Sequence, residues 1–169
     1  AHALAFLGGL YHGVYTMDPA FPGVVCTSAN LGRVSQTQDV LEVCTFLRSA
    51  RAEQEGELAA RHQALAQAHG FTGQFTGYPG WPGDRANPLA AVLERVYLAQ
   101  TGRALDISAV HVGLEPSVLR AKAPGLVMVS TGPDILDAHS VHERAPLASL
   151  PDYALLLAGT LEALASEGK

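Results

Sequence analysis

The chain has 169 residues, of which 48% are hydrophobic, and its formal net charge is −5 at pH 7. That length allows one domain or two small ones, and the apolar content is ample for a packed core. No run of basic residues occurs, which argues against nucleic acid or an anionic membrane as a partner. The longest apolar run is far too short to span a membrane.

The start of the chain and its two cysteines bear on the cellular compartment. Residues 1–8 contain neither a methionine nor a basic segment, so we do not interpret them as a signal peptide. Cys26 and Cys44 lie on neighbouring predicted strands and could face each other. In an intracellular protein such thiols are more often reduced core residues, and we expect both to stay unpaired.

The first part of the chain predicts a helix end followed by a small sheet. Residues 1–10 are mostly apolar and small, which is typical of the end of a helix. Residues 13–17 are expected to form a short strand. β-branched residues dominate 24–30 and 40–47, with a polar connection between them, so these two segments predict a long hairpin.

A helix is expected after the hairpin. Ser49 is its predicted N-cap, and the helix runs to about His69, with Gly70 in the left-handed position that ends it. Residues 71–76 are then expected to form another strand. Strand, strand, helix and strand together predict a compact α+β layer.

Residues 77–87 differ in composition from the segments on either side. They contain three glycines, two prolines and the single tryptophan of the chain. Such a stretch has little helix or strand preference, and the apolar periodicity restarts after it. We therefore predict one domain over residues 1–76 and a second over residues 77–169.

The second half begins with a strong helix signal. Asn87 is an N-cap residue, Pro88 suits the first helical position, and Gly102 is expected to end the helix. Residues 107–112 are expected to form a strand, and residues 113–120 a short helix.

A further strand and a helix complete the predicted elements. Residues 126–130 are short and apolar, as in a buried strand. Ser149 and Asp152 have the spacing of a capping box, which predicts a C-terminal helix to about residue 166. Alternating helices and strands are typical of a layered α/β sheet.

Residues 132–144 gather the polar chemistry of the chain. This loop carries two aspartates, two histidines and a glutamate after a predicted buried strand, which is where sites lie on open α/β sheets. His139 and His142 do not have the spacing of a known zinc helix. A zinc site needs three or four protein ligands, so further ligands would have to come from elsewhere. Histidine beside aspartates on a loop is more often a surface residue, and that alternative stays open.

Two further side chains allow a functional and a structural interpretation. Arg48 ends a predicted strand and could bind a carboxylate through two parallel hydrogen bonds, or it could be solvated. Glu115 could contact a ligand, or it could be a helix N-terminal acid that interacts with the helix dipole. The sequence has no Gly-x-Ser-x-Gly elbow, no phosphate-binding loop and no dinucleotide fingerprint.

Several short motifs occur together in one order and spacing. They are residues 27–32 (TSANLG), 47–49 (LRS), 77–81 (GYPGW), 87–89 (NPL), 111–115 (HVGLE), 130–133 (STGP) and 138–144 (AHSVHER). Taken together, they resemble the C-terminal half of the aminoacyl-histidine dipeptidases, the cytosolic non-specific dipeptidases of the zinc aminoacylase/carboxypeptidase clan. The resemblance covers nearly the whole chain.

This resemblance implies roles for individual residues. In the family, a lid domain that also dimerises is inserted into the catalytic domain; residues 1–76 resemble the end of the lid, and 77–169 the end of the catalytic domain. His139 corresponds to a metal ligand. Arg48 and Asn30 correspond to the lid residues that hold the substrate's free carboxylate. Gly113 to Glu115 corresponds to a loop near the substrate.

The chain also departs from the family. Val141 and His142 stand where the family usually has Pro-Asp. The family's His-x-Asp motif, its bridging aspartate and its Glu-Glu pair, which supply most zinc ligands and the general base, have no counterpart here. The resemblance therefore implies no catalytic residue within this chain.

The resulting hypothesis is a cytoplasmic, homodimeric dipeptidase with two zinc ions per active site. Its substrates would be Xaa-His and other dipeptides, and this chain alone, without the N-terminal half, is expected to be inactive. The alternative is a non-catalytic module, derived from that family, that dimerises or binds a peptide.

Overall fold

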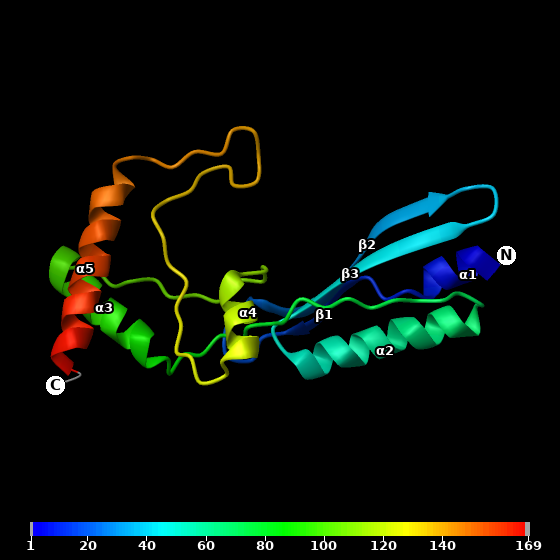
Figure 1. Ribbon diagram of the computed structural model, residues 1–169, viewed down its shortest axis with the longest axis horizontal. Helices are drawn as coiled ribbons and strands as arrows, with labels where there is room; N and C mark the ends of the chain where they lie inside the picture. Colours follow the sequence, from blue (N-terminus) through cyan, green and yellow to red (C-terminus); the bar gives the residue numbers. More distant parts are fainter. Residues whose placement is uncertain (1, 168–169) are drawn as a thin grey trace. The chain divides into compact units, whose positions relative to one another are not determined.

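A computed structural model describes residues 2–167 of the chain (Figure 1). The chain divides into two compact units. They are Ala1–Asp84 with Ser108–Pro124, and Arg85–Ile107 with Gly125–Lys169. The predicted division after residue 76 concerns the domains of an intact protein and stays a prediction. No helix in the described part is both long and apolar enough to cross a membrane.

The first unit contains a three-stranded antiparallel sheet in the order β1-β2-β3. The strands are β1 (Gly13–Met17), β2 (Val25–Gln36) and β3 (Leu41–Ser49). The predicted short strand and the predicted hairpin are therefore confirmed, and so is the α+β class. The register pairs Ser28 with Arg48, so these two side chains share one face of the sheet.

One helix covers the opposite face of this sheet. Helix α2 (Ala52–Ala68) places Leu58 completely out of solvent, and Thr27 of β2 is equally buried. The Thr27 hydroxyl lies 2.7 Å from the Gln54 side chain of α2. Burying a leucine of this kind contributes about 1.5–3 kcal/mol. The face of the sheet with Arg48 is thus the one that α2 leaves uncovered.

The predicted start of α2 is wrong by two residues. Arg51 is the N-cap residue and has no capping side chain. Ser49 is instead the last residue of β3, where its hydroxyl accepts a hydrogen bond from the Arg51 N–H at 3.0 Å. A serine in this position closes a tight turn as readily as it caps a helix. Gly70 adopts the expected left-handed conformation, with φ 75°.

Residues 71–76 do not form the predicted strand. Phe71 stacks on Phe6 of helix α1 (His2–Gly9), with ring centroids 4.2 Å apart. The chain then returns along α2, past Gln63, to the end of β3 (Figure 1). Strand propensity requires a neighbouring strand to accept the ladder hydrogen bonds, and this segment runs beside a helix instead.

Gly80 makes the closest approach along this return segment. A Cβ atom there would lie 2.2 Å from the Ser49 carbonyl oxygen and 2.8 Å from the Ala50 carbonyl carbon. We expect Gly80→Ala to lower the free energy of unfolding by about 1–3 kcal/mol, because backbone must move to admit the methyl group. Thermal denaturation measures this. Gly56→Ala is the control: a Cβ in mid-helix α2 meets nothing, so stability should rise by about 0.5–1 kcal/mol.

His62 is a buried imidazole between α2 and β3. Its Nδ1 lies 3.4 Å from the Thr45 hydroxyl, and its Nε2 has no hydrogen-bond partner in the described part. Burial lowers the pKa of His62, the backbone of Tyr11 opposes this shift, and the positive charge of Arg61 adds to it. The imidazole is therefore neutral in the folded protein at neutral pH.

This lowered pKa predicts a pH-dependent stability. The unfolded chain takes up a proton at His62 at a higher pH than the folded chain does. The contribution of His62 to the free energy of unfolding is therefore fully present above about pH 6.5 and is lost as the pH falls below that value. The melting temperature should fall between pH 7.5 and 5.5, and His62→Leu should weaken that fall. Substitution of the exposed His2 by Gln is the control. An unchanged slope in His62→Leu would assign the effect to other groups.

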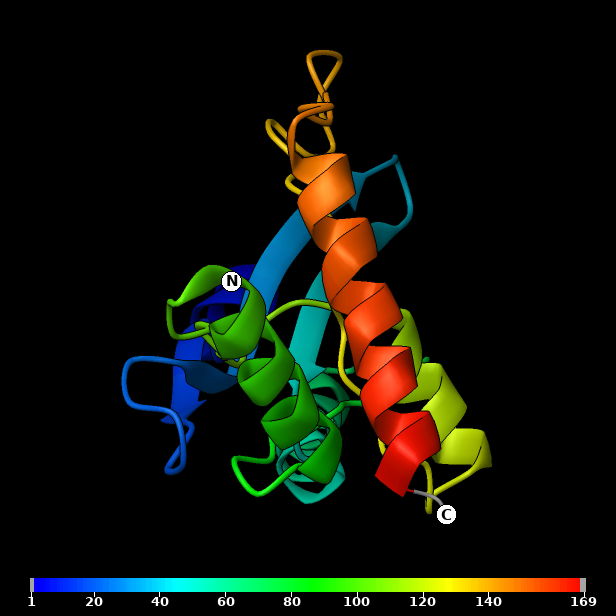
Figure 2. The ribbon, with the colours of Figure 1, turned by 90° about the vertical axis from the view of Figure 1, so that its left-hand side faces the viewer.

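The second unit is built on two packed helices. Helix α3 (Pro88–Thr101) and helix α5 (Ser149–Glu167) lie side by side (Figure 2). Val92 and Leu93 of α3 and Leu156 of α5 are buried, and the Gln100 amide donates a hydrogen bond of 2.9 Å to the Leu155 carbonyl.

Helix α3 has both ends where the sequence predicts them. The Asn87 side chain accepts hydrogen bonds from the N–H groups of Leu89 and Ala90 at 2.9 and 3.2 Å. Gly102 ends the helix in a left-handed conformation, with φ 69°. The Asn87 amide also donates to the Met128 carbonyl at 2.8 Å, which ties the helix start to the segment before the polar loop.

Helix α5 begins at the predicted residue but without a capping box. The Ser149 hydroxyl donates to the Pro146 carbonyl at 2.8 Å and accepts from the Asp134 N–H at 3.2 Å. Ser149 therefore fastens the polar loop to the helix start. The predicted short helix at 113–120 is formed two residues later, as α4 (Glu115–Lys122), and it belongs to the first unit.

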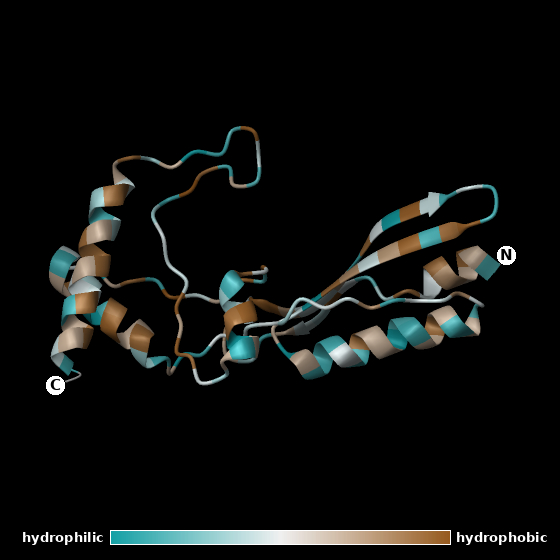
Figure 3. Ribbon diagram, in the orientation of Figure 1, coloured by the Kyte–Doolittle hydropathy of each residue, from teal (hydrophilic) through white to brown (hydrophobic). Residues whose placement is uncertain are grey.

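The predicted strands at 107–112 and 126–130 are not formed. Within residues 2–167, neither segment pairs with a neighbouring strand. Val110 and Val127 are 57% and 50% exposed, and Figure 3 shows apolar residues along the extended connection after α4. Both segments are apolar, as the sequence shows, but a strand also needs a neighbouring strand that forms hydrogen bonds with its backbone groups. The layered α/β sheet predicted for the second half is accordingly absent from the described residues.

Candidate functional site

Arg48 stands on the uncovered face of the sheet in the first unit. Its Nη1 donates a hydrogen bond of 3.0 Å to the carbonyl oxygen of His111, and the side chain is otherwise exposed. Asn30 follows Ser28 by two residues on β2, so it shares this face. The strand fixes the direction of Arg48, and the His111 carbonyl restrains one nitrogen of its guanidinium.

His111 is a residue for which the sequence suggested no separate role. Its Nε2 lies 2.7 Å from the Ser28 hydroxyl, and the backbone of Val25 also acts on its ring. These contacts attach the segment before α4 to β2. The two bonded residues are 83 positions apart, so no local pattern could indicate the contact.

The electrostatics at His111 favour a neutral ring. Burial lowers the pKa of His111, the positive charge of Arg48 lowers it further, and the backbone of Val25 opposes both. A neutral imidazole does not compete with Arg48 for an anion or repel its guanidinium. Arg33 shares this face through its pairing with Cys44, but it forms an ion pair with Glu42. Arg48 has no acidic partner among the described residues, so its positive charge is the one left for an anionic ligand.

Gly113 and Glu115 follow His111 directly and belong to the same unit. A Cβ on Gly113 would contact the Tyr78 ring at 3.5 Å, so the segment passes close to that aromatic side chain. Glu115 is the first residue of α4 and is exposed. Its carboxylate makes no hydrogen bond or ion pair with another described residue. As the acidic residue in the first turn of α4, Glu115 interacts favourably with the helix dipole.

His139 belongs to the second unit, in a closed loop. Leu136 and Arg144 exchange both backbone hydrogen bonds, at 2.9 and 3.1 Å, and Arg144 forms an ion pair with Asp137. The Ser140 hydroxyl donates to the Asp137 carbonyl at 2.7 Å. These bonds close the hairpin on itself and leave the His139 imidazole exposed.

The backbone of this loop is strained at two positions. Asp137 and His139 have φ values of 54° and 65°, in the left-handed region that residues with a Cβ rarely adopt. Each such residue costs about 1–2 kcal/mol, which the loop's hydrogen bonds must offset. The His139 N–H donates to Glu143 Oε2 at 2.7 Å, a charge-assisted bond of the stronger kind.

The structure tests whether this loop could hold a metal by itself. Among residues 2–167 no group of three or more His, Cys, Asp or Glu side chains is arranged to bind a metal ion. Asp137 and Glu143 are engaged within the loop, whereas the His139 ring is exposed and bonds to no described residue. Within the described residues His139 can therefore supply at most one metal ligand, and a zinc site that includes it would need further ligands.

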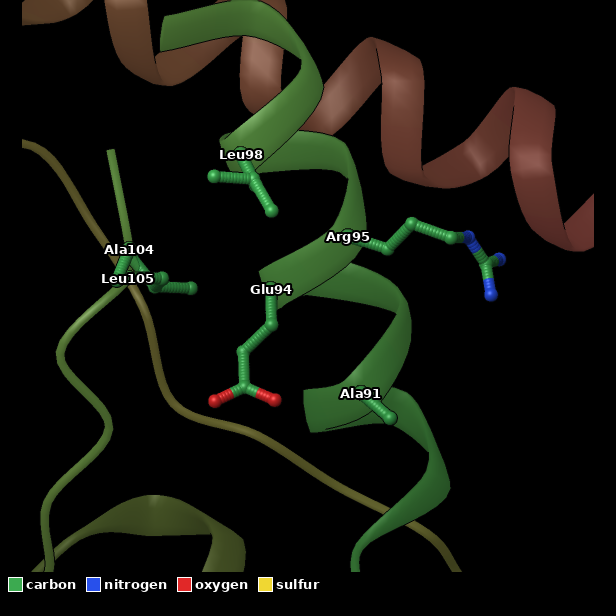
Figure 4. A pocket seen from close by; sticks show the side chains of 6 residues that line it. All are labelled: Ala91, Glu94, Arg95, Leu98, Ala104 and Leu105. Carbon is green, nitrogen blue, oxygen red and sulfur yellow. The ribbon is translucent and has the colours of Figure 1, made fainter. Parts of the chain in front are cut away.

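The cysteines and the hollow beside α3 do not extend the site. Cys26 and Cys44 are free thiols. An open hollow of about 370 Å³ is lined by six residues, with Leu98, Leu105 and the Glu94 carboxylate turned toward it (Figure 4). None of the predicted binding residues lines it.

The antiparallel sheet with its covering helix, joined to a helix-paired unit, is a fold found in peptidases. Aminopeptidase PepT from Bacillus cereus ATCC 10987 has a similar structure, with a TM-score of 0.75 at 20% identity over 97% of this chain and 44% of that one. At this level of identity the likeness concerns the fold alone. No protein-family model matches the chain.

Two dipeptidases are more similar to this chain in sequence than PepT is. The aminoacylhistidine dipeptidase of Vibrio alginolyticus has a TM-score of 0.85 and 28% identity over 96% of this chain and 33% of its own. The cytosol non-specific dipeptidase of Escherichia coli K12 is 28% identical over 160 residues, 94% of this chain and 33% of that protein. The chain spans about a third of the length of these relatives and matches their C-terminal part. The resemblance derived from the motifs is confirmed.

Proposed function

We propose that this chain forms the C-terminal part of a zinc-dependent dipeptidase. The observation that carries the proposal is the Arg48 guanidinium, fixed on the uncovered sheet face by the His111 carbonyl. A restrained, exposed arginine beside a neutral histidine suits recognition of a small anionic group. The two similar proteins are dipeptidases, and a dipeptide ends in a free carboxylate, which supports that group as the ligand of Arg48.

Arg48 selects the substrate in this proposal. Its remaining nitrogens donate two parallel hydrogen bonds to the dipeptide carboxylate, and the Asn30 amide adds a third donor. Gly113 and Glu115 line the approach to the substrate, with the missing Cβ at Gly113 leaving room beside Tyr78. In a longer peptide the C-terminal carboxylate lies farther from the first peptide bond, so we expect dipeptides to be preferred.

His139 supplies one zinc ligand as a neutral imidazole. Zinc, once bound, polarises the peptide carbonyl and lowers the pKa of a bound water. The remaining ligands of the two zinc ions and the general base belong to the N-terminal half of the protein. The left-handed backbone at His139 fixes the direction in which its ring leaves the loop.

The remaining features follow from the same proposal. Residues 1–76 belong to a lid domain and residues 77–169 to a catalytic domain of a cytoplasmic protein. The hairpin of β2 and β3 carries Phe46, 62% exposed, together with the exposed Val34 and Val40. An exposed apolar surface on a lid supports a homodimer through that lid.

The isolated chain should have no peptidase activity. Within the part that the structure describes, it cannot surround a metal ion, so the chemistry that zinc provides is not available to it. Incubation of the purified 169-residue chain with zinc and an aminoacyl-histidine dipeptide should release no free histidine. Turnover that co-purifies with the chain through several columns would contradict this expectation.

A non-catalytic role is the second candidate. The absence of a three-ligand cluster from the described residues favours a module that only dimerises or binds a peptide. The two candidates differ in what precedes the chain in its gene. An upstream reading frame with His-x-Asp and Glu-Glu motifs supports the dipeptidase, whereas an upstream stop codon or an unrelated domain supports the module.

A further inference from the structure

We propose, on the basis of the proposed function, that Glu143 is a positioning residue that holds His139 in its metal-binding orientation. The contact is direct: Glu143 Oε2 accepts the hydrogen bond of the His139 N–H at 2.7 Å. Glu143 therefore acts on the backbone of His139 and leaves the imidazole free.

His139 needs such a partner because of its backbone. At φ 65° its Cβ and ring leave the chain in a direction that a right-handed conformation would not provide. Without the bond to its N–H, the residue can relax to the favoured region and redirect the imidazole. An anchored peptide plane before His139 prevents this rotation.

The rest of the loop holds Glu143 in place. The Glu143 N–H donates to the Ser140 carbonyl at 3.2 Å, and the next residue, Arg144, pairs through its backbone with Leu136. Asp137 is occupied by its ion pair with Arg144. Glu143 is thus the carboxylate of this loop that reaches the His139 amide.

The rival interpretation is that Glu143 binds the metal itself. Glutamine separates the two possibilities, because its side-chain oxygen still accepts an N–H hydrogen bond but is a much weaker metal ligand than a carboxylate. Glu143→Gln should therefore preserve a positioning role and destroy a ligand role. Glu143→Ala removes both.

The first arm of the experiment measures the contact in the intact, metal-free protein labelled with ¹⁵N-histidine. Exchange of the His139 amide hydrogen should be at least about tenfold faster in Glu143→Ala and within about threefold of wild type in Glu143→Gln. Val141→Ala is the matched control, since that side chain is 96% exposed in the same loop. Fast exchange in the wild type, or no change in Glu143→Ala, would overturn the proposal.

The second arm measures zinc affinity in the same variants. Glu143→Ala should weaken binding of one zinc about 10–100-fold, and Glu143→Gln should recover most of it. Equal losses in both variants would show that Glu143 is a ligand and overturn the proposal. Normal affinity in Glu143→Ala, with a zinc lost in His139→Ala, would overturn it while the proposed function stands. Full zinc retention in His139→Ala would overturn the proposed function and this inference with it.

Discussion

Arg48→Ala should lower kcat/KM of the intact protein about a hundredfold for dipeptides with a free carboxylate. Charge-assisted hydrogen bonds of the kind proposed contribute about 1.5–3 kcal/mol each, and a hundredfold loss corresponds to about 2.7 kcal/mol. Metal content should not change. Stability should change little, because the side chain is exposed and makes one hydrogen bond, to the His111 carbonyl.

Three comparisons separate substrate binding from a structural role of Arg48. Arg48→Lys should lose at least about tenfold, since an ammonium group cannot make two parallel bonds. Arg33→Ala is the matched control, because Arg33 pairs on the surface with Glu42 of the same hairpin, and its activity should equal that of wild type. A C-terminally amidated dipeptide should be a poor substrate on which the Arg48→Ala defect largely disappears. Equal defects on acid and amide would make Arg48 structural.

His139→Ala should remove one zinc ion from the intact protein and lower activity at least about hundredfold. Loss of a direct ligand exceeds the 10–100-fold effect that is usual for residues that only orient a ligand. Elemental analysis of the purified protein gives the zinc content, and steady-state kinetics gives the activity. The exposed loop should tolerate the change without loss of stability.

The substitution His142→Asp tests whether an acid at this position of the loop affects zinc binding at His139. The His142 backbone N–H donates to the Ser140 hydroxyl at 3.1 Å, so its main chain helps to form the loop whatever its side chain. An aspartate there should leave zinc content unchanged or improve it, if the acid usual in the family only orients a ligand. Full zinc content and near-normal turnover in His139→Ala would instead show that another residue is the ligand.

Local signals in the sequence were sufficient where the responsible contacts are local. Asn87, Pro88 and Gly102 define the two ends of α3 through groups at most a few residues away. The hairpin of β2 and β3 likewise depends on neighbouring segments. Ser49 is compatible with two local structures, a helix N-cap and a turn. A helix cap was expected, but the hydroxyl closes a turn at the end of β3.

The failures occurred where the outcome depends on distant partners. Residues 107–112 and 126–130 have strand composition, but composition does not reveal whether a neighbouring strand is present. The contact of His111 with Ser28 is equally non-local, so the motif that contains His111 indicated a substrate loop without showing that its backbone restrains Arg48. The hydrogen bond from the His139 N–H to Glu143 could not be predicted from the sequence either, because it depends on the unusual φ angle of His139.

The most direct test of the central claim is a crystal structure of the intact, zinc-loaded protein with a non-hydrolysable dipeptide analogue. We expect the analogue's carboxylate at about 2.7–2.9 Å from two nitrogens of Arg48, and a ring nitrogen of His139 at about 2.0–2.1 Å from zinc. An analogue whose carboxylate is bound away from Arg48, with no metal at His139, would contradict it.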